Sequence, residues 1–562
     1  MKKINSLILF LSVIIFNFLP FGEIGLPAVG RWGCLLAQQP VTQEWVRSYG
    51  YQDSLNDLLN DMALDSNGNI IVTGRIATSS QNTNYATVKY NPLGIQQWVA
   101  TYNGPGSNSI DESIAVCTDI NGNVYITGYS EEYGFLTDAY CTIKYDSLGN
   151  QLWLARYKNL PNGMDDPTAI AVDYQGNVYV TGSSQSFAGF DYLTIKYDSN
   201  GDSLWVRRYR GPGTANPDNY AYSICLDNQG NVYVTGESPE GLNSREACTI
   251  KYNSQGVQQW VVRHDTVNAS GGYKVIIDRL TNDVYICGYW GGGGPTPQYL
   301  MVSKISSGGI KQWTKYYTGG ISEAGHDIRI DNSHNIFVVG KAIFTQPIED
   351  NYITIKYNTN GDTLWVRRFN VVQSTNSYPA LTIDKFNNVY ITGIRWQTSN
   401  YEFVTLKYDN GGNQKWLMTY PGGGAKINVD INLNVYVAGN NSSAGTGVDF
   451  TTIKYSQPNG ITPISSNVPK KFNLLQNYPN PFNPNTKIIF SLPVNSYVSL
   501  IIYDIMGREI EILINENLNA GEYKYEWYAK GFSSGIYFCK MLAHSETKIE
   551  SFYNVKKLML VK

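Results

Sequence analysis

Charged side chains are scarce in this sequence of 562 residues. Asp, Glu, Lys and Arg make up 16% of it, and the formal net charge is -3 at pH 7. Proteins that bind nucleic acids usually present a basic surface, because contacts with phosphates supply much of their affinity. The composition therefore argues against a nucleic-acid partner.

Residues and motifs that commonly carry catalysis are also few. The sequence has four histidines, and we expect His326 and His334 at opposite ends of one strand, about 25 Å apart. It has no Gly-x-Ser-x-Gly elbow between a strand and a helix and no phosphate-cradling glycine-rich loop. The acidic pairs Glu131–Glu132 and Asp165–Asp166 are more simply solvated loop residues than the two carboxyl groups of a glycosidase. We therefore predict no catalytic residues, no metal site and no cofactor.

Cysteine does not follow the pattern of a disulfide framework. The seven cysteines are an odd number, and Cys117 and Cys141 in one repeat correspond to Cys225 and Cys248 in another. These positions are expected on the first and third strands of one sheet, about 9–10 Å apart. A disulfide needs Cα atoms within about 7 Å of each other. The four cysteines are therefore predicted to be buried thiols.

Long hydrophobic runs are limited to the N-terminus. Met1-Lys2-Lys3 precedes the apolar run Leu7–Leu19, a pattern typical of a secretory signal peptide, which we place at residues 1–37. A lipoprotein signal acylated at Cys34 is the alternative, although Arg31-Trp32-Gly33 is a poor lipobox. The run is short for a retained membrane anchor. No later segment is long and apolar enough to span a bilayer, so we predict no transmembrane segment after signal removal.

One short motif dominates what is present. Asn123-Val-Tyr-Ile-Thr-Gly128 recurs with small changes at 177–182, 231–236 and 388–393, and looser copies end at Gly74, Gly288, Gly340 and Gly439. A period of about fifty residues is typical of propellers and solenoids. Each repeat contains four strand-like segments. The second is apolar on both faces and so needs cover on both sides, which blades stacked about an axis provide.

Two series of residues predict the number of blades and how the ring closes. Fourth-strand tryptophans occur at 45, 98, 153, 205, 260, 313, 365 and 416, and third-strand lysines at 89, 144, 196, 251, 304, 356, 407 and 454. The chain thus opens with a fourth strand and ends its repeats with a third. We predict an all-β fold: an eight-bladed β-propeller over residues 41–456, closed by its N-terminal strand.

The recurrent Asp119, Asp173 and Asp227 precede Gly-Asn turns, where a carboxylate can accept backbone N–H bonds. A calcium loop is the alternative for residues 119–123, but the distal bidentate Glu of an EF-hand is missing.

The connections that differ between blades are expected on one rim of the ring, and they carry aromatic residues. Aromatic rings beside Asn, Asp and Ser suit sugar or peptide binding, and packing of these rings on their own blades is the alternative. The candidate ligand-binding residues are Tyr129, Tyr133, Phe187, Tyr289, Trp290, Trp396 and Tyr401.

The repeats resemble two known families. Asp-x-x-Gly-Asn-Val-Tyr-Val-Thr-Gly and Thr-Ile-Lys-Tyr resemble the β-propeller repeat of secreted bacterial proteins, called SBBP, over most of the ring. Gly94–Trp98, Gly201–Trp205, Gly256–Trp260 and Gly361–Trp365 are similar to the tryptophan-docking repeat of eight-bladed quinoprotein alcohol dehydrogenases. The adjacent-cysteine disulfide of that second family is missing here, and its acidic calcium cluster cannot be matched.

The composition changes after the last repeat. Residues 457–471 contain Pro458, Pro463 and Pro469 and are predicted to be a linker. Residues 472–562 are expected to form a small C-terminal β-sandwich. Phe472–Ile488, Val498–Arg508, Leu518–Tyr523, Ser534–Lys540 and Lys556–Lys562 resemble, in order, the type A sorting domain of the type IX secretion system.

This resemblance implies that the tail is recognised by the type IX secretion machinery and then removed. It also implies a secreted or outer-surface location in a Gram-negative bacterium. Together these observations predict a secreted or cell-surface propeller that is a non-catalytic binding or adhesion scaffold for an extracellular carbohydrate or protein. The alternatives are an extracellular polysaccharide hydrolase or lyase and a quinoprotein-like dehydrogenase.

Overall fold

The computed structural model describes residues 41–562 except 52–54, 107–108, 133–136, 213–217, 241–243, 265–268, 292–296, 346–347, 373–377, 398–399, 443–446, 458–460, 466–467, 530–531 and 546–550. The regular elements in this part of the chain are β-strands, and none is a helix. Among these residues there is accordingly no helix of the length and hydropathy needed to cross a membrane. The predicted signal peptide, residues 1–37, lies outside the described ranges.

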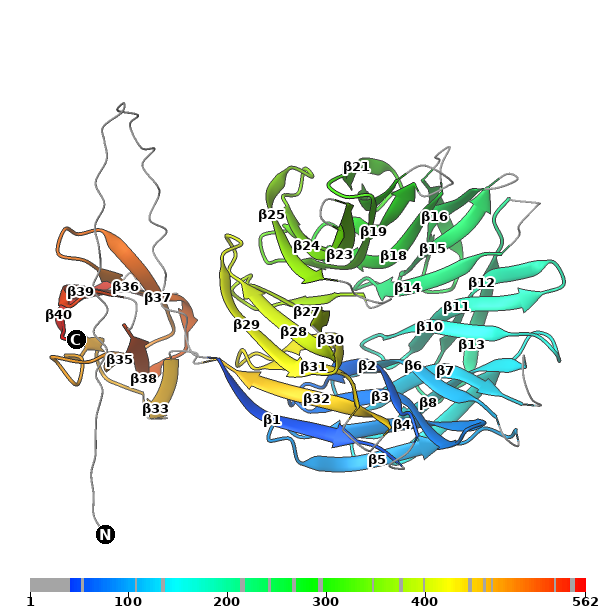
Figure 1. Ribbon diagram of the computed structural model, residues 1–562, viewed down its shortest axis with the longest axis horizontal. Helices are drawn as coiled ribbons and strands as arrows, with labels where there is room; N and C mark the ends of the chain where they lie inside the picture. Colours follow the sequence, from blue (N-terminus) through cyan, green and yellow to red (C-terminus); the bar gives the residue numbers. More distant parts are fainter. Residues whose placement is uncertain are drawn as a thin grey trace, which may run out of the picture.

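Antiparallel sheets of four consecutive strands make up the first half of the larger unit (Figure 1). Their strands are β2 (Leu58–Leu64), β3 (Ile70–Ser79), β4 (Asn82–Tyr90) and β5 (Gln96–Tyr102); β6 (Asp111–Thr118), β7 (Val124–Glu131), β8 (Asp138–Tyr145) and β9 (Gln151–Tyr157); β10 (Asp165–Val172), β11 (Val178–Ser186), β12 (Gly189–Tyr197) and β13 (Ser203–Tyr209); and β14 (Tyr220–Leu226), β15 (Val232–Glu240), β16 (Ser244–Tyr252) and β17 (Gln258–Arg263).

The same pattern continues, with one fusion between sheets. The next strands are β18 (Ser270–Ile277), β19 (Val284–Gly291), β20 (Gln298–Ile305), β21 (Lys311–Tyr317), β22 (Ser322–Ile330), β23 (Ile336–Thr345), β24 (Ile348–Tyr357) and β25 (Thr363–Val372). A single parallel bridge, Gln298 with Ser322, joins β20 to β22, so these eight strands form one sheet. Its two halves would bring the number of blades to eight if counted separately, and that number stays a prediction.

The ring is closed by strands from both ends of the propeller. After β26 (Ala380–Ile383), β27 (Val389–Gln397), β28 (Asn400–Tyr408) and β29 (Gln414–Pro421), the last sheet contains β30 (Gly423–Val429), β31 (Val435–Ser442), β32 (Val448–Ser456) and β1 (Thr42–Tyr49). β1 runs antiparallel to β32, with Thr42 opposite Ser456 and Tyr49 opposite Phe450. The predicted closure by the N-terminal strand is therefore confirmed.

The burial pattern places each sheet between two neighbours. Tyr125 and Ile126 point to opposite faces of β7, and both are fully buried. The first strands of neighbouring sheets contact one another, as β2 does with β6 and with β30, so they line the centre of the ring. The fourth strands are the least buried: each begins with two exposed residues, and most of the residues that follow are half-buried. The predicted all-β propeller is confirmed.

A repeated contact at the turn between the third and fourth strands joins neighbouring sheets. The indole of Trp98 donates to the carbonyl oxygen of Ser147 (3.1 Å), and Lys89 Nζ donates to the same oxygen (3.3 Å). Trp98 also covers Gly149, whose φ is +89° and where an added Cβ would lie 2.7 Å from the indole. The Gly-x-x-x-Trp spacing therefore arises because each turn glycine lies under the tryptophan of the preceding sheet.

The turn aspartates cap the turns between the first and second strands, as the sequence predicts. Asp119 Oδ1 accepts the backbone N–H groups of Asn121 (2.9 Å) and Asn123 (3.0 Å), and Oδ2 accepts the hydroxyl of Tyr125 (2.9 Å). In four further repeats a tyrosine hydroxyl donates to the turn aspartate in the same way, at Asp173, Asp227, Asp384 and Asp430. Both oxygens of this carboxylate therefore accept hydrogen bonds from groups of its own repeat.

The cysteines that the structure describes are free thiols. Cys117, Cys141, Cys225 and Cys248 are all in this state, as predicted from the strand spacing; Cys141 and Cys248 are buried as expected, whereas Cys117 and Cys225 are only partly buried. Burial raises the pKa of Cys248 to about 11 and that of Cys141 to about 12, so these thiols are unreactive at neutral pH.

The C-terminal unit is a β-sandwich, as predicted. One sheet contains β33 (Ile461–Ser465), β38 (Gly521–Tyr528), β35 (Asn485–Leu492) and β34 (Asn473–Leu474); the other contains β37 (Glu509–Leu518), β36 (Ser496–Tyr503), β39 (Gly535–Ser545) and β40 (Ser551–Leu560). Phe490 and Leu500, from different sheets, lie in one core with Trp527. The segment 457–471 differs from the expected linker, because β33 pairs with β38 and so belongs to the sandwich.

Candidate functional site

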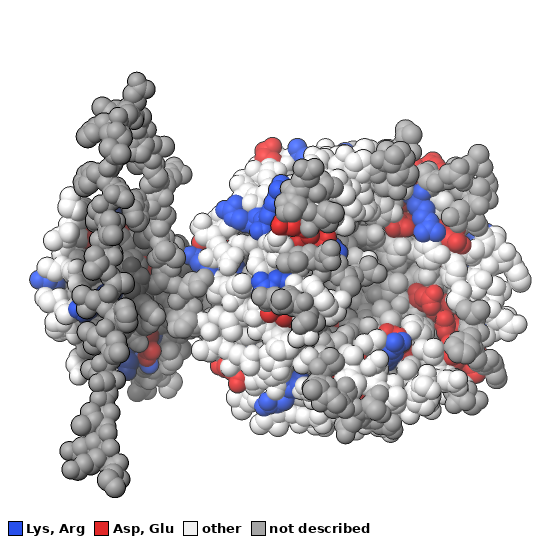
Figure 2. Space-filling view, in the orientation of Figure 1, with Lys and Arg blue, Asp and Glu red and all other residues white. Residues whose placement is uncertain are grey.

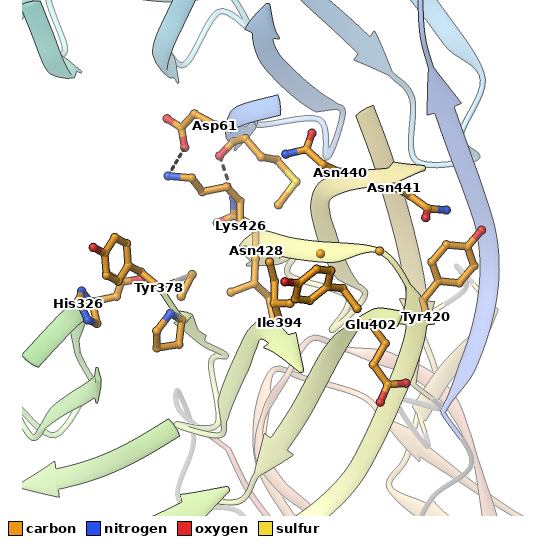
Figure 3. A pocket seen from close by; sticks show the side chains of 18 of the residues that line it. Asp61, His326, Tyr378, Ile394, Glu402, Tyr420, Lys426, Asn428, Asn440 and Asn441 are labelled. Carbon is orange, nitrogen blue, oxygen red and sulfur yellow. Dashed lines mark hydrogen bonds and ion pairs between the residues drawn. The ribbon is translucent and has the colours of Figure 1, made fainter. Parts of the chain in front are cut away.

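A cavity of about 1870 Å³ opens at the centre of the ring, at the end where the first strands begin. Its lining comes from the first strands β2, β14, β18, β22 and β30 and from the β27–β28 and β29–β30 connections. Figure 3 shows part of this lining, with His326 and Tyr378 on one side and Asp61 and Lys426 near each other beyond them. Cavities of this size accommodate small molecules or several sugar units.

A β-bulge at the same place in the first strands supplies the most distinctive part of the lining. The pairing with the second strand shifts by one residue at Tyr222, Tyr273 and His326. Each of these residues lies five positions before the turn aspartate of its repeat. A bulge re-aims a side chain and is often found beside a binding site. Here the bulges place three aromatic rings at equivalent positions of three successive first strands, β14, β18 and β22.

These rings and Tyr378 form a continuous series, the aromatic arc. Tyr273 lies 5.7 Å from Tyr222 and 5.6 Å from His326, with the His326 ring nearly parallel to it at 10°. The centroids of His326 and Tyr378 are 4.2 Å apart (Figure 3). Tyr378 is 59% exposed, so one face of the arc is open to a ligand. Such faces pack well against the C–H groups of sugars.

Charged and amide groups lie beside the arc. Lys426 Nζ is 3.3 Å from Asp61 Oδ1 (Figure 3), and Arg329 pairs with Asp327. Asn428 Nδ2 donates to the carbonyl of Met62 (3.3 Å). Lys274, Asn440, Asn441 and Glu402 complete the polar lining. The cavity thus combines aromatic faces with hydrogen-bonding groups, which is the composition expected of a carbohydrate site.

His326 is held in its neutral form. Burial, with a smaller contribution from the charge of Lys341, lowers the pKa of His326 to about 3. A neutral imidazole has one nitrogen that donates and one that accepts a hydrogen bond, so it can bind a hydroxyl group in either direction.

The depressed pKa of His326 predicts a pH-dependent stability. An unfolded histidine binds its proton near pH 6.5, whereas the folded one does not until about pH 3. The unfolded state therefore binds more protons between these values, and the contribution of His326 to stability is lost as pH falls through this window. Replacing His326 by Gln should reduce the loss of unfolding free energy between pH 7 and 5 by about 1 to 2 kcal/mol. Urea titrations of both proteins at these two pH values measure it.

Phe187→Ala, which removes no ionisable group, is the control for this measurement. Burial raises the pKa of Glu323 to about 7 and that of Asp166 to about 6, and raised carboxyl pKa values make stability fall as pH rises. These groups are present in parent and variant alike. The difference in pH dependence between the two proteins therefore reports on His326. Equal pH dependence of His326→Gln and the parent would contradict a neutral, buried His326.

The seven residues predicted as ligand-binding from the sequence lie at several places. Trp396 and Tyr401 line the cavity, 4.5 Å apart and edge to face. The ring of Tyr289 lies 5.4 Å from that of Tyr273, tilted by 43°, and its hydroxyl donates to Glu237 Oε1 (3.1 Å). Tyr133 lies outside the described ranges.

The remaining three lie away from the cavity lining. Trp290 stacks on Tyr299 (5.7 Å), so it packs within its own sheet. The hydroxyl of Tyr129 donates to Glu112 Oε2 (2.7 Å). Phe187 is 98% exposed at the hairpin between β11 and β12. The structure therefore brings Trp396 and Tyr401 together and leaves Phe187 alone on the surface.

The acidic pairs also have structural partners. Asp165 Oδ2 accepts the backbone N–H of Asn159 (2.8 Å), and Glu131 Oε2 accepts that of Ile110 (2.8 Å). Burial and the neighbouring Asp166 and Glu131 raise the pKa of Asp138 to about 7. None of these acids lines the central cavity that the described residues form.

Sequence reasoning missed most of the cavity lining. Tyr222, Tyr273, His326, Lys274 and Arg329 lie on first strands, which the repeat pattern identifies only as buried elements. An alignment of the repeats on their turn aspartates would have shown the position five residues earlier changing from Ile114 and Thr168 to aromatic residues. That change is the signal that separates this part of the ring from the rest.

Two family models match parts of the chain. The beta-propeller repeat matches residues 157–191, and the secretion system C-terminal sorting domain matches residues 476–554. The tail is a type IX sorting domain. The chain is therefore exported by the type IX system to the cell surface or the extracellular space, and its tail associates it with the secretion machinery.

Similar proteins add little about function. An uncharacterized WD repeat-containing protein of Acanthamoeba polyphaga mimivirus is 22% identical over 484 residues, which cover 69% of this chain. The chain spans only 30% of the length of that relative.

The comparison with solved structures gives weak similarities, of which two are as follows. PorZ, a bacterial surface component of the type IX secretion system of Porphyromonas gingivalis, has a TM-score of 0.35 at 13% identity, covering 91% of this chain and 74% of PorZ. A polysaccharide lyase, the PL25 ulvan lyase, has a TM-score of 0.41 at 12% identity, covering 67% of this chain and 96% of the lyase. At these TM-scores the similarity carries no argument about activity.

Proposed function

We propose that this exported propeller is a binding or adhesion scaffold that holds an extracellular carbohydrate in its central cavity. The observation that carries the proposal is the aromatic arc of Tyr222, Tyr273, His326 and Tyr378, one end of which is open at the cavity mouth. Sugar rings present flat C–H surfaces and many hydroxyl groups, and the amides of Asn428 and Asn441 line the same cavity as the arc.

In the face shown in Figure 2, most of the described propeller surface is uncharged, and the charged side chains lie in small groups of both signs. Of the described residues, no group of three or more His, Cys, Asp or Glu side chains is arranged to hold a metal ion. The binding site that we propose is the central cavity, because the aromatic arc lines it.

Removal of one exposed ring tests this site. Tyr378→Ala should weaken binding of an oligosaccharide about tenfold, because loss of an aromatic stacking contact costs on the order of 1 kcal/mol or more. Tyr378 is 59% exposed, so the fold should tolerate the change. Screening the purified chain on a glycan array identifies the probe, and calorimetric titration of the best glycan gives the affinity.

The matched control is Phe187→Ala, which removes an aromatic ring that is even more exposed and lies outside the cavity. We expect its affinity to equal that of the parent. Equal losses in both variants, or a loss only in Phe187→Ala, would move the site from the cavity to the rim.

A polysaccharide lyase is the second candidate, and one observation favours it. His326 lies between Tyr273 and Tyr378 in the cavity, and its imidazole has an unprotonated nitrogen that can accept a proton, but the lowered pKa makes it a weak base. A hydrolase is less well supported, because Asp61 and Asp327 are both engaged in ion pairs. Incubation with acidic polysaccharides, followed by ultraviolet absorbance of unsaturated products, separates the two functions: product formation that is lost in His326→Gln would replace the scaffold proposal.

A further inference from the structure

The residue that follows the bulge has a recurring structural role in the propeller. Four positions before the turn aspartate, its side chain accepts a backbone N–H from the first strand of the next repeat in three repeats, whereas alanine occupies the position in three others, at Ala115, Ala169 and Ala380. Asp61 accepts from Val116 N (3.0 Å) and Asp327 accepts from Leu381 N (3.0 Å). Ser223 accepts from Val275 N (3.3 Å).

Lys274 occupies this position on β18, and an ammonium group has no lone pair with which to accept a hydrogen bond. By equivalence with the other repeats, Lys274 would face the backbone N–H of Ile328. That N–H instead donates to the carboxylate of the adjacent Asp327 (3.0 Å). Lys274 is therefore not explained by the structural role of its position.

Lys426 provides a direct comparison, because it occupies the same position on β30. Its ammonium pairs with Asp61, the equivalent residue of the next sheet, at 3.3 Å. The equivalent partner of Lys274 is Asp327, but Arg329 pairs with Asp327, and both carboxylate oxygens also accept backbone N–H groups. Among the described residues Lys274 has no ion pair or hydrogen bond of its side chain.

Lys274 also lies where a ligand would reach it. It follows Tyr273 on β18, which runs from the cavity mouth toward its turn at Asp278, so Lys274 lies one residue deeper than the aromatic arc. Burial, partly offset by the charge of Asp327, lowers the pKa of Lys274. An ammonium without a close carboxylate in a confined space is stabilised by any anion that enters.

We propose that Lys274 binds the acidic group of the saccharide held by the arc, and that the ligand is therefore an anionic polysaccharide. The sugar ring lies on the exposed aromatic faces, and its carboxylate or sulfate group is directed inward to Lys274, with Arg329 as a second donor. This inference rests on the proposed carbohydrate-binding function and adds the chemical class of the ligand.

Calorimetric titration of the purified chain with three kinds of probe of equal length tests the inference. Oligogalacturonates carry carboxylates, carrageenan oligosaccharides carry sulfates, and cello-oligosaccharides are neutral. We expect at least one acidic series to bind more tightly than the neutral series, with an affinity that falls as salt is added. Which acidic series binds more tightly distinguishes a uronate from a sulfate ligand.

The decisive variant is Lys274→Ser, because Ser223 shows that the fold accepts serine at this position. We expect it to fold normally and to lose about 10- to 100-fold in affinity for the acidic probe, as removal of a charged hydrogen bond does. Its affinity for a neutral probe should not change. Lys274→Arg should retain most of the binding. Lys385→Ser removes one positive charge from the exposed turn after β26 and should have no effect.

Each outcome of the titrations separates the inference from the function on which it rests. Equal binding of acidic and neutral probes, or an unchanged affinity of Lys274→Ser for the acidic probe, would overturn the role of Lys274 and leave the carbohydrate site standing. Absence of binding to every glycan, in a chain that is folded by circular dichroism, would overturn both.

Discussion

Deletion of residues 41–50 is expected to abolish cooperative folding of the propeller. These residues include β1, which supplies the fourth strand of the last sheet. Their removal leaves β32 as an unpaired edge along the register from Thr42–Ser456 to Tyr49–Phe450. It also removes Trp45, which is 8% exposed and packs between Tyr90 and Tyr436. Loss of one buried tryptophan alone costs about 3 to 5 kcal/mol, a large part of the stability of an ordinary domain.

Thermal denaturation and size-exclusion chromatography measure this effect. We expect the deletion variant to unfold at a much lower temperature, without a single sharp transition, and to associate through the β32 edge. A synthetic peptide of residues 41–50 should restore part of the stability, since it can pair with β32 in trans. An unchanged transition temperature in the deletion variant would show that the ring does not depend on β1.

The closure could be predicted because two periodic signals are out of phase. The tryptophan series begins with Trp45 and the lysine series ends with Lys454, so the chain has a fourth strand to spare at one end and lacks it at the other. The same contacts pack each blade against the next. They therefore require the same residue type at the same position of each repeat, which is visible in the sequence. The sorting tail could also be predicted, because each of its motifs is a short continuous stretch of the sequence.

The cavity could not be predicted in the same way, because it depends on differences between repeats. A β-bulge has no residue of its own that marks it, so the turn of Tyr222, Tyr273 and His326 toward the ring centre is visible only in the pairing register. The aromatic residues chosen from the sequence came from the connections. Trp396 and Tyr401 reach the cavity because the β27–β28 hairpin ends at its mouth, whereas Phe187 ends in solvent.

At the interface where the ring closes, Gln457 makes a contact that the repeat pattern does not predict. At seven interfaces a fourth-strand tryptophan donates its indole N–H to a backbone carbonyl in the next sheet's third–fourth turn. The last sheet has no such turn, because its third and fourth strands come from opposite ends of the chain. Gln457 Oε1 takes its place and accepts from Trp416 Nε1 (3.0 Å) and Lys407 Nζ (2.7 Å). The ring therefore extends to Gln457, one residue beyond the boundary expected from the sequence.

Gln457→Ala is accordingly expected to destabilise the propeller by about 4 kcal/mol, because several buried polar groups lose their partner at once and each costs about 1 to 3 kcal/mol. Besides Trp416 and Lys407, the carbonyl of Leu433 loses the donor Nε2 (2.7 Å). The cost to Lys407 is high, since burial already lowers the pKa of its ammonium to about 8. Urea denaturation followed by tryptophan fluorescence measures the change.

Two further variants separate this role from a general sensitivity of glutamines. Gln457→Glu keeps an acceptor for Trp416 and adds a counter-ion for Lys407, but it cannot donate to Leu433, so its stability should lie between those of the parent and Gln457→Ala. Gln255→Ala changes an exposed side chain in one of the backbone turns that Gln457 replaces, and should cost less than about 0.5 kcal/mol. Equal stabilities of Gln457→Ala and Gln255→Ala would mean that the last interface holds without a substitute for its missing turn.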